Sequence, residues 1–86
     1  MCMDIVFHKQ FTKKFKKLSP KIQNQFYERL ELFLTYPTHP TLNNHRVGRV
    51  FSGCRSINIT GDYRAVFHQD KSTATFITIG THSELY

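Results

Sequence analysis

The sequence has 86 residues, enough for one domain spanning 1–86. At this size folding buries only roughly 60–65% of the surface of the unfolded chain, so the core must be dense. Twelve Lys and Arg against six Asp and Glu give a net charge of +6, which favours polyanions or an acidic protein partner; a solvated basic surface is the alternative. Cys2 and Cys54 are too few and too far apart for a disulfide framework or a zinc site. No apolar run approaches the ~18 residues of a membrane span and no signal peptide is recognisable, so we expect a reduced cytoplasmic protein without a membrane partner.

The first part of the chain predicts a strand followed by two helices. Met3 to Phe7 has the pattern of a short strand. Three apolar residues then recur at helical spacing among lysines, which predicts a short basic amphipathic helix; they are Phe11, Phe15 and Leu18. A second helix is expected to start with Ser19 as N-cap and Pro20 as its first residue. It should end near Tyr36, because the residue before a proline is pushed out of the α region.

The second half predicts only strands, after a loop from Pro37 to Asn44 that is rich in Pro, Thr, His and Asn. Short polar links separate four strand-like runs, which are Val47 to Phe51, Arg55 to Ile59, Tyr63 to His68 and Ala74 to Ile79. Links this short require antiparallel neighbours. We therefore expect an α+β fold in which an N-terminal strand and two helices pack on an antiparallel β-meander.

Alternation along the third and fourth of the predicted strands separates two faces. Ile57 and Ile59 share an apolar face, and the opposite face is polar and points away from the helices. The polar face is formed by Ser56, Asn58 and Thr60. Arg64 shares its side of the next strand with Val66 and His68, and because both sides of that strand contain apolar residues, alternation alone does not tell which side joins the polar face.

Several segments occur together in a way that is informative about the family. They are the strand-helix-helix start with a lysine-rich first helix, a His ahead of the sheet, the strand Gly53-Cys54-Arg55, the turn Gly61-Asp62-Tyr63-Arg64 and the ending Gly80-Thr81-His82-Ser83-Glu84-Leu85-Tyr86. In this combination the chain resembles the RelE/ParE superfamily of bacterial toxins, and within it the YafQ-like mRNA endonucleases. The resemblance covers essentially the whole chain, and the ending is its most specific part.

The resemblance implies a small cytoplasmic ribonuclease that cuts mRNA, in most such toxins on the ribosome. It also implies a toxin monomer held inactive in a complex with a cognate antitoxin. The cut needs no metal and no other cofactor, since the substrate's own 2′-hydroxyl attacks the adjacent phosphorus. The enzyme must then remove one proton, donate another to the leaving 5′-oxygen and neutralise charge on the phosphate oxygens.

Two histidines are expected to carry these protons. His82 matches the His of the Gly-Thr-His ending, to which the resemblance assigns the role of general acid, and imidazole can hold or release a proton at neutral pH. His45 matches a His that the YafQ-like branch carries ahead of its sheet and is the candidate for the second proton carrier. The alternatives are a His82 that caps the tail by a hydrogen bond and a His45 that is an ordinary surface residue. A metal site that combines them with His39 or Cys54 follows no known ligand spacing.

Two further residues match the family around the turn before the fourth strand. Asp62 matches an acidic residue that would orient a histidine or act as a base, although Gly-Asp is also an ordinary turn pair. Arg64 matches the strand Arg of RelE-like toxins, whose fixed charge would grip the scissile phosphate and stabilise the developing oxyanions. The alternative for Arg64 is an ion pair with Glu84 or Asp62.

The expected substrate contacts are less specific. Tyr86 matches a terminal aromatic residue that would stack on a base, and the alternative is packing over the sheet edge. Arg55 and the lysines of the first helix carry no motif, and we expect them to position phosphates of mRNA or ribosomal RNA without reading sequence. The lysine-rich helix could equally meet an acidic antitoxin.

Ser56 and Asn58 depart from the family pattern. RelE-like toxins have two lysines at these positions and YafQ-like toxins an acid and a His, so one catalytic position has lost its titratable group. Asn58 can still hydrogen-bond a phosphate or a base, but it cannot exchange protons at neutral pH. Three functions therefore stay open: a ribonuclease that relies on His45, Asp62 and His82, a ParE-like inhibitor of DNA gyrase, and a degenerate module that binds RNA or antitoxin.

Overall fold

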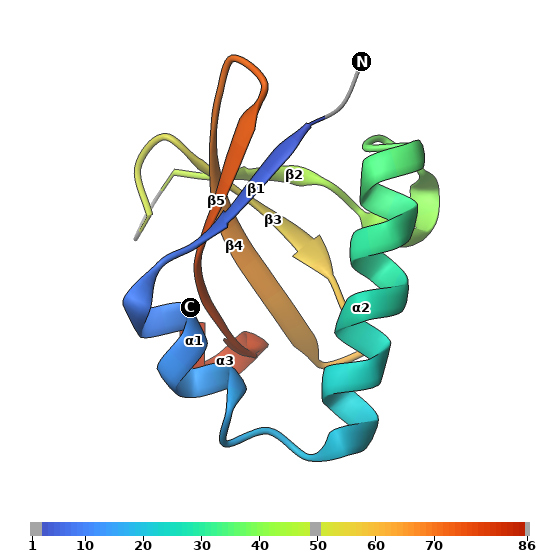
Figure 1. The fold of residues 1–86 in the computed structure, drawn as a ribbon, viewed down its shortest axis with the longest axis vertical. Helices are drawn as coiled ribbons and strands as arrows, with labels where there is room; N and C mark the ends of the chain where they lie inside the picture. The colour runs from blue at the N-terminus through green and yellow to red at the C-terminus, as the bar shows by residue number, and fades with distance from the viewer. Residues whose placement is uncertain (1–2, 49–50, 86) are drawn as a thin grey trace.

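The computed structural model describes residues 3–48 and 51–85 as a five-stranded sheet with helices packed against it (Figure 1). In chain order the elements are β1 (Asp4–Phe7), α1 (Lys9–Phe15), α2 (Pro20–Thr35), the 3-10 helix η1 (Pro40–Leu42), β2 (His45–Val47), β3 (Cys54–Asn58), β4 (Tyr63–Asp70), β5 (Thr73–Thr81) and α3 (His82–Leu85). The strand order is β1-β5-β4-β3-β2, in which β2 to β5 form the predicted antiparallel meander. β1 lies beside β5 in parallel orientation, so the sheet is mixed. The predicted α+β fold is confirmed.

The bounds of α2 follow from local sequence signals. The hydroxyl of Ser19 accepts a hydrogen bond from the backbone N–H of Ile22 at 3.4 Å, and Pro20 occupies the first helical position. Tyr36 ends the helix immediately before Pro37. A proline cannot disturb the first turn, where N–H groups have no intrahelical acceptor, but it excludes helical geometry from the residue before it. Both predicted ends of this helix are confirmed.

The prediction for the first meander strand is wrong. A strand was expected over Val47 to Phe51, whereas the structure has it at His45–Val47, with a turn at Gly48 and a bend at Phe51. Part of the predicted strand, residues 49–50, lies outside the described residues. The reason is that β2 is an edge strand, where exposed polar side chains such as His45 are tolerated, so the apolar run does not mark its position.

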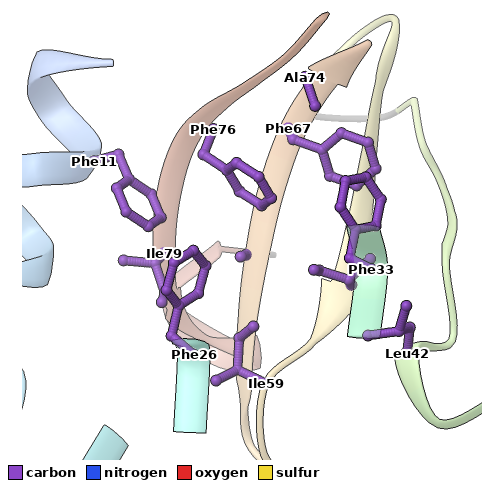
Figure 2. Packing of buried hydrophobic residues seen from close by; sticks show 11 residues of the cluster. Phe11, Phe26, Phe33, Leu42, Ile59, Phe67, Ala74, Phe76 and Ile79 are labelled. Carbon is purple, nitrogen blue, oxygen red and sulfur yellow. The ribbon is translucent and has the colours of Figure 1, made fainter. Parts of the chain in front are cut away.

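A network of phenylalanine rings fills the space between the helices and the sheet (Figure 2). Phe33 of α2 meets Phe67 of β4 edge-on, with ring centroids 5.0 Å apart, and Phe26 of α2 lies perpendicular to Phe76 of β5 at 5.6 Å. All four rings are at most 1% exposed. Each ring buries on the order of 150–250 Å², and edge-to-face pairs add about 0.5–1.5 kcal/mol beyond that burial. This network holds α1 and α2 on one face of the sheet.

The opposite face of the sheet is not the open polar surface that alternation predicts. A second apolar cluster forms there from Val47, Cys54, Val66 and Leu85, with Phe51 and Ile77 against it. Ser56 lies on this face, paired with Val66, and is fully buried. The physical cause is α3, because its Leu85 turns back toward the sheet and covers part of the face.

The register also answers which side of β4 carries Arg64. Asn58 pairs directly with Arg64 and Ser56 with Val66, and directly paired residues share a face, so all four lie on the side away from α2. Ala65 and Phe67 lie in the main core, as do Ile57 and Ile59. The predicted separation of the β3 side chains onto two faces is confirmed.

Replacing Phe76 with Ala tests the aromatic network. The Phe76 ring lies 5.4–6.0 Å from five other rings, those of Phe7, Phe11, Phe26, Phe33 and Phe67. Because a Phe-to-Ala change in a packed core costs about 3–5 kcal/mol, we expect a loss of that size in the free energy of unfolding, measured by urea denaturation. Leu34→Ala on the exposed side of α2 is the control and should change stability by about 0.5 kcal/mol or less. A loss under about 1 kcal/mol for the Phe76 variant would contradict the proposed importance of this network.

Candidate functional site

The end of β5 is joined to α3 by a reciprocal pair of hydrogen bonds. The hydroxyl of Thr81 accepts from the backbone N–H of Glu84 at 3.3 Å, and the carboxylate of Glu84 accepts from the backbone N–H of Thr81 at 2.8 Å. This is the capping box, in which an N-cap Thr and a Glu three residues later satisfy each other's N–H groups. His82 is the first residue of this helix and lies between Thr81 and Glu84, so the capping box orients its backbone.

Gly80 allows α3 to lie close to the sheet. A Cβ atom at this position would meet the Glu84 carboxylate oxygen at 3.3 Å and the Leu85 side chain at 3.5 Å. The hydrogen bonds from Thr81, first from its backbone N–H and then from its hydroxyl, lower the pKa of Glu84, and the charge of Lys14 on α1 acts in the same direction. Lys14 itself donates to the hydroxyl of Thr78 on β5 at 3.3 Å. The short helix is therefore held to both the sheet and α1.

The β3–β4 turn brings two more of the predicted site residues to the same corner. The backbone N–H of His82 donates to the carbonyl of Asp62 at 3.0 Å, which continues the β4–β5 ladder by one step beyond Thr81. The hydroxyl of Thr60 accepts from the backbone N–H of Asp62, which shapes the turn. Arg64 pairs with Gly80 on one side and with Asn58 on the other. The structure thus gathers Asp62, His82, Arg64 and Asn58 at one end of the sheet, where Figure 1 shows α3 beside the start of β4.

Arg64 is held by backbone carbonyls. Its Nη1 donates to the carbonyls of Thr60 at 3.1 Å, Gly61 at 3.2 Å and Tyr63 at 3.2 Å, all in its own turn. These bonds replace the ion pair with Glu84 or Asp62 that was the alternative for this residue. A guanidinium anchored through one nitrogen keeps its full charge and a defined direction, while its fork retains further donors for an anion.

His45 lies on the same face, at the β2 edge. It pairs with Ser56 across the β2–β3 ladder, and its Nδ1 donates to the carbonyl of Asn43 at 2.7 Å. With Nδ1 carrying the proton, Nε2 of the neutral ring is the atom that can accept one. Three strand spacings of ~4.8 Å separate β2 from β5, so the backbones of these two strands are about 14 Å apart. The sheet therefore places His45 and His82 on opposite sides of Asn58 and Arg64.

Two oxygen atoms on this face lack a hydrogen-bond partner within the described part of the chain. They are Oγ of Ser56 and Oδ1 of Asn58, and both atoms are buried. The two residues alternate on β3, so their side chains are roughly 7 Å apart along the strand and cannot satisfy each other. A buried polar atom without a partner costs about 1–3 kcal/mol, and such atoms concentrate at functional sites. The positions that depart from the family pattern are thus where this face can still receive a hydrogen bond.

One of the predicted substrate contacts, Arg55, is not brought to this face. Arg55 pairs with Phe67, which lies in the main core, so Arg55 belongs to the opposite side of β3. Its Nε donates to Oδ1 of Asn44 at 2.6 Å, and Asn44 in turn donates to the carbonyl of Pro37 at 2.8 Å. Arg55 therefore ties β3 to the loop that follows α2. Tyr86 lies outside the described residues.

Two basic hollows lie away from the corner. One, of about 300 Å³, is lined in part by Arg46 and Arg55, which are directly opposite each other on β2 and β3. The other, of about 510 Å³, lies along α1 and is lined by Lys9, Thr12, Lys13, Lys16 and Lys17. Among residues 3–48 and 51–85, no three His, Cys, Asp or Glu side chains are grouped as metal ligands, and no helix is long and apolar enough to span a membrane.

Sequence reasoning missed the supports of this site. The motif comparison gives Thr81 and Glu84 no structural role, although Thr-x-x-Glu is a recognisable helix start in the sequence itself. Asn44 and Lys14 had no signal, because their partners are distant in sequence and become neighbours only in the fold.

A protein-family model described as the ParE toxin of the type II toxin-antitoxin system parDE matches residues 5–86. The chain belongs to this family of toxins. Among curated protein sequences, none matches the chain significantly. ParE toxins are part of the RelE/ParE superfamily that the motifs predict, so this resemblance is confirmed.

Solved structures of toxins with the same fold include the toxin YafQ. YafQ from Escherichia coli BL21(DE3) superposes with a TM-score of 0.81 at 19% identity, covering 98% of each chain. YafQ in the E. coli DinJ-YafQ toxin-antitoxin complex gives 0.81 at 20% identity, over 100% of this chain and 99% of that one. A chain of the toxin-antitoxin complex RelBE2 from Mycobacterium tuberculosis gives 0.77 at 18% identity, over 95% and 100%. The ParE-family chain therefore has the fold of the RelE and YafQ toxins.

The depressed pKa of Glu84 has a consequence for this ParE-family toxin at acid pH. Because the folded-state pKa lies below the usual 4.5, the carboxylate stabilises the fold above that value, and the contribution disappears as the pH falls through the folded-state pKa. We expect an NMR titration of the Glu84 side chain to have its midpoint below 4.5. In Thr81→Val, which lacks the hydroxyl, the midpoint should move back toward 4.5. A wild-type midpoint at or above 4.5 would contradict the capping box.

Proposed function

We propose that this toxin is an endoribonuclease that cuts mRNA by attack of the substrate's own 2′-hydroxyl, without a metal ion. The observation that carries the proposal is the corner where the β4–β5 ladder and the Asp62–His82 hydrogen bond gather a histidine, a carboxylate, an arginine and an amide. The histidine and the arginine supply two of the functions that this reaction requires, and the carboxylate and the amide support them. The net charge of +6 favours RNA approach.

The roles follow from the chemistry of the side chains. The 2′-oxygen forms a bond to phosphorus as its proton passes to a base, and the bond from phosphorus to the 5′-oxygen breaks as that oxygen takes a proton from an acid. The products are a 2′,3′-cyclic phosphate and a 5′-hydroxyl. His82 donates the proton to the leaving oxygen, and Asp62 beside it orients the imidazole. Arg64 stabilises the charge on the non-bridging oxygens, and Asn58 contributes a hydrogen bond.

His45 is proposed as the base at the 2′-hydroxyl. Attacking and leaving oxygens lie roughly in line through phosphorus, so the base and the acid must approach from opposite sides. His45 on β2 and His82 after β5 flank Asn58 and Arg64 in this way. The hydrogen bond from Nδ1 of His45 to Asn43 leaves Nε2 to accept the proton.

The partners proposed for this toxin are an mRNA on the ribosome and a cognate antitoxin, with the toxin as a monomer in the inactive complex. Support for the antitoxin comes from the family, which belongs to toxin-antitoxin systems, and from neighbours solved as toxin-antitoxin complexes. The lysine-lined hollow along α1 suits either the phosphates of ribosomal RNA or the acidic side chains of the antitoxin. Tyr86 is proposed to stack on a substrate base. These partners place the action of the toxin in the cytoplasm.

Removal of the imidazole at position 82 tests the proposal. A general acid contributes about 10²–10⁴-fold, so His82→Ala should lower the cleavage rate of a reporter mRNA by that factor. Cleavage is read by primer extension after brief induction in cells and in a purified translation system. His68→Ala is the matched control, because His68 is exposed on β4 and lies at the far end of the strand from Arg64. Full cleavage by His82→Ala would contradict the assignment of the acid.

The second candidate function is that of a ParE-like inhibitor of DNA gyrase. It is favoured by the family model, which is that of the ParE toxin, and by Asn58, which cannot exchange a proton. A gyrase supercoiling assay with purified toxin separates the two functions. Inhibition of supercoiling that survives His82→Ala, without any cuts in mRNA, would establish the gyrase function and overturn the ribonuclease.

A further inference from the structure

We propose that Glu84 and Thr81 are positioning residues for His82, and that the capping box they form keeps the imidazole in place for proton transfer. The inference rests on the proposed ribonuclease function, since it assigns a role in that reaction. Neither residue needs to touch the substrate. Their effect passes through the backbone of His82, which is the residue that follows the N-cap and precedes the carboxylate by two positions.

The box is the connection that defines the helix start. α3 has four residues, and a helix this short is not stable by itself in water. Thr81 ends β5 in register with Tyr63, so it belongs to the rigid sheet. The two bonds between Thr81 and Glu84, at 2.8 and 3.3 Å, therefore transfer the orientation of the sheet to the first turn of α3. Without them, the backbone after Thr81 would lose the two bonds that join the start of α3 to the end of β5, while the packing of Leu85 and the bond from His82 to Asp62 would remain.

Two neighbours hold the carboxylate where the box needs it. Gly80 leaves room for the Glu84 oxygen, which lies 3.3 Å from the place a Cβ atom would occupy. Lys14 on α1 attracts the carboxylate and is itself anchored to Thr78. Gly80 also pairs with Arg64, so the residue that makes room for the box lies beside the proposed phosphate-binding arginine. One local arrangement thus sets the relative position of the acid and the cation.

This arrangement matters because proton transfer is sensitive to placement. A displacement of about 1 Å in a catalytic group can cost on the order of 10²-fold in rate. A helix start that fluctuates would lower the fraction of time in which the imidazole of His82 reaches the 5′-oxygen. The expected signature is a reduced rate at saturating substrate with an unchanged half-saturating concentration.

The experiment uses the full-length toxin and single-turnover cleavage of an mRNA on programmed ribosomes. We expect Glu84→Ala and Thr81→Val to lower the maximal rate by about tenfold to a hundredfold, with the half-saturating concentration unchanged. Glu84→Gln and Thr81→Ser keep the required acceptors, since Gln also completes a capping box, and should stay within about threefold of wild type. Glu31→Ala, which removes a carboxylate from the exposed side of α2, is the charge control and should have no effect.

Hydrogen exchange gives a readout that does not depend on cleavage. In Glu84→Ala the backbone amide of His82 should lose protection by tenfold or more, while amides of β4 and β5 in the main core keep theirs. Equal cleavage rates for all the variants would overturn the positioning role. A Glu84→Gln toxin as slow as Glu84→Ala would also overturn it, because the carboxylate itself would then be required. If wild type does not cut RNA, the ribonuclease proposal fails by itself. Unchanged exchange protection of the His82 amide in Glu84→Ala would then still contradict the structural role of the capping box.

Discussion

The structure depends on the contact between the phenylalanine rings of α2 and those of the sheet. A chain of 86 residues can bury only one main core, and here Phe26 and Phe33 on one side and Phe67 and Phe76 on the other supply it. Rings of this size bridge the full distance between the helix and the sheet. With both longer helices committed to this face, the part of the opposite face that α3 does not cover is left for the proposed site.

The proposed site on that opposite face is assembled by sheet register more than by loops. Asn58, Arg64 and Gly80 form one row across three strands, and the row of His45, Ser56 and Val66 is its neighbour. Side chains on paired strands have fixed spacings, so such a face is a rigid support for reacting groups. Two residues of the proposed site do not lie on strands. They are Asp62, in the β3–β4 turn, and His82, at the start of α3, and one backbone hydrogen bond joins them.

The predictions that rest on local signals agree with the structure. The ends of α2 follow from Ser19-Pro20 and from Pro37, and the two faces of β3 follow from strict alternation, because both depend on neighbours in the sequence. The grouping of Asp62 with Arg64 follows from their shared turn. His82 is predicted to lie in the tail after the last strand, whereas the structure has it at the start of α3.

What sequence reasoning could not supply depends on contacts between distant segments. The position of β2 was wrong because an edge strand does not require an apolar run. The burial of Ser56 could not be predicted, since the apolar cluster on its face includes Leu85, which is distant in the sequence. The anchoring of Arg55 by Asn44, on the side away from the site, likewise requires the fold. The capping box differs from these features, because its Thr-x-x-Glu pattern is present in the sequence and could have been predicted.

The central claim is that the 2′-hydroxyl of the substrate is the nucleophile, and the most direct measurement is the chemistry of the cut ends. An mRNA is cleaved on programmed ribosomes, and a matched mRNA carries a single 2′-deoxynucleotide at the scissile position. We predict a 2′,3′-cyclic phosphate and a 5′-hydroxyl from the first, and no cut in the second. A 3′-hydroxyl with a 5′-phosphate, or cleavage of the deoxy-substituted message at the same position, would contradict the account.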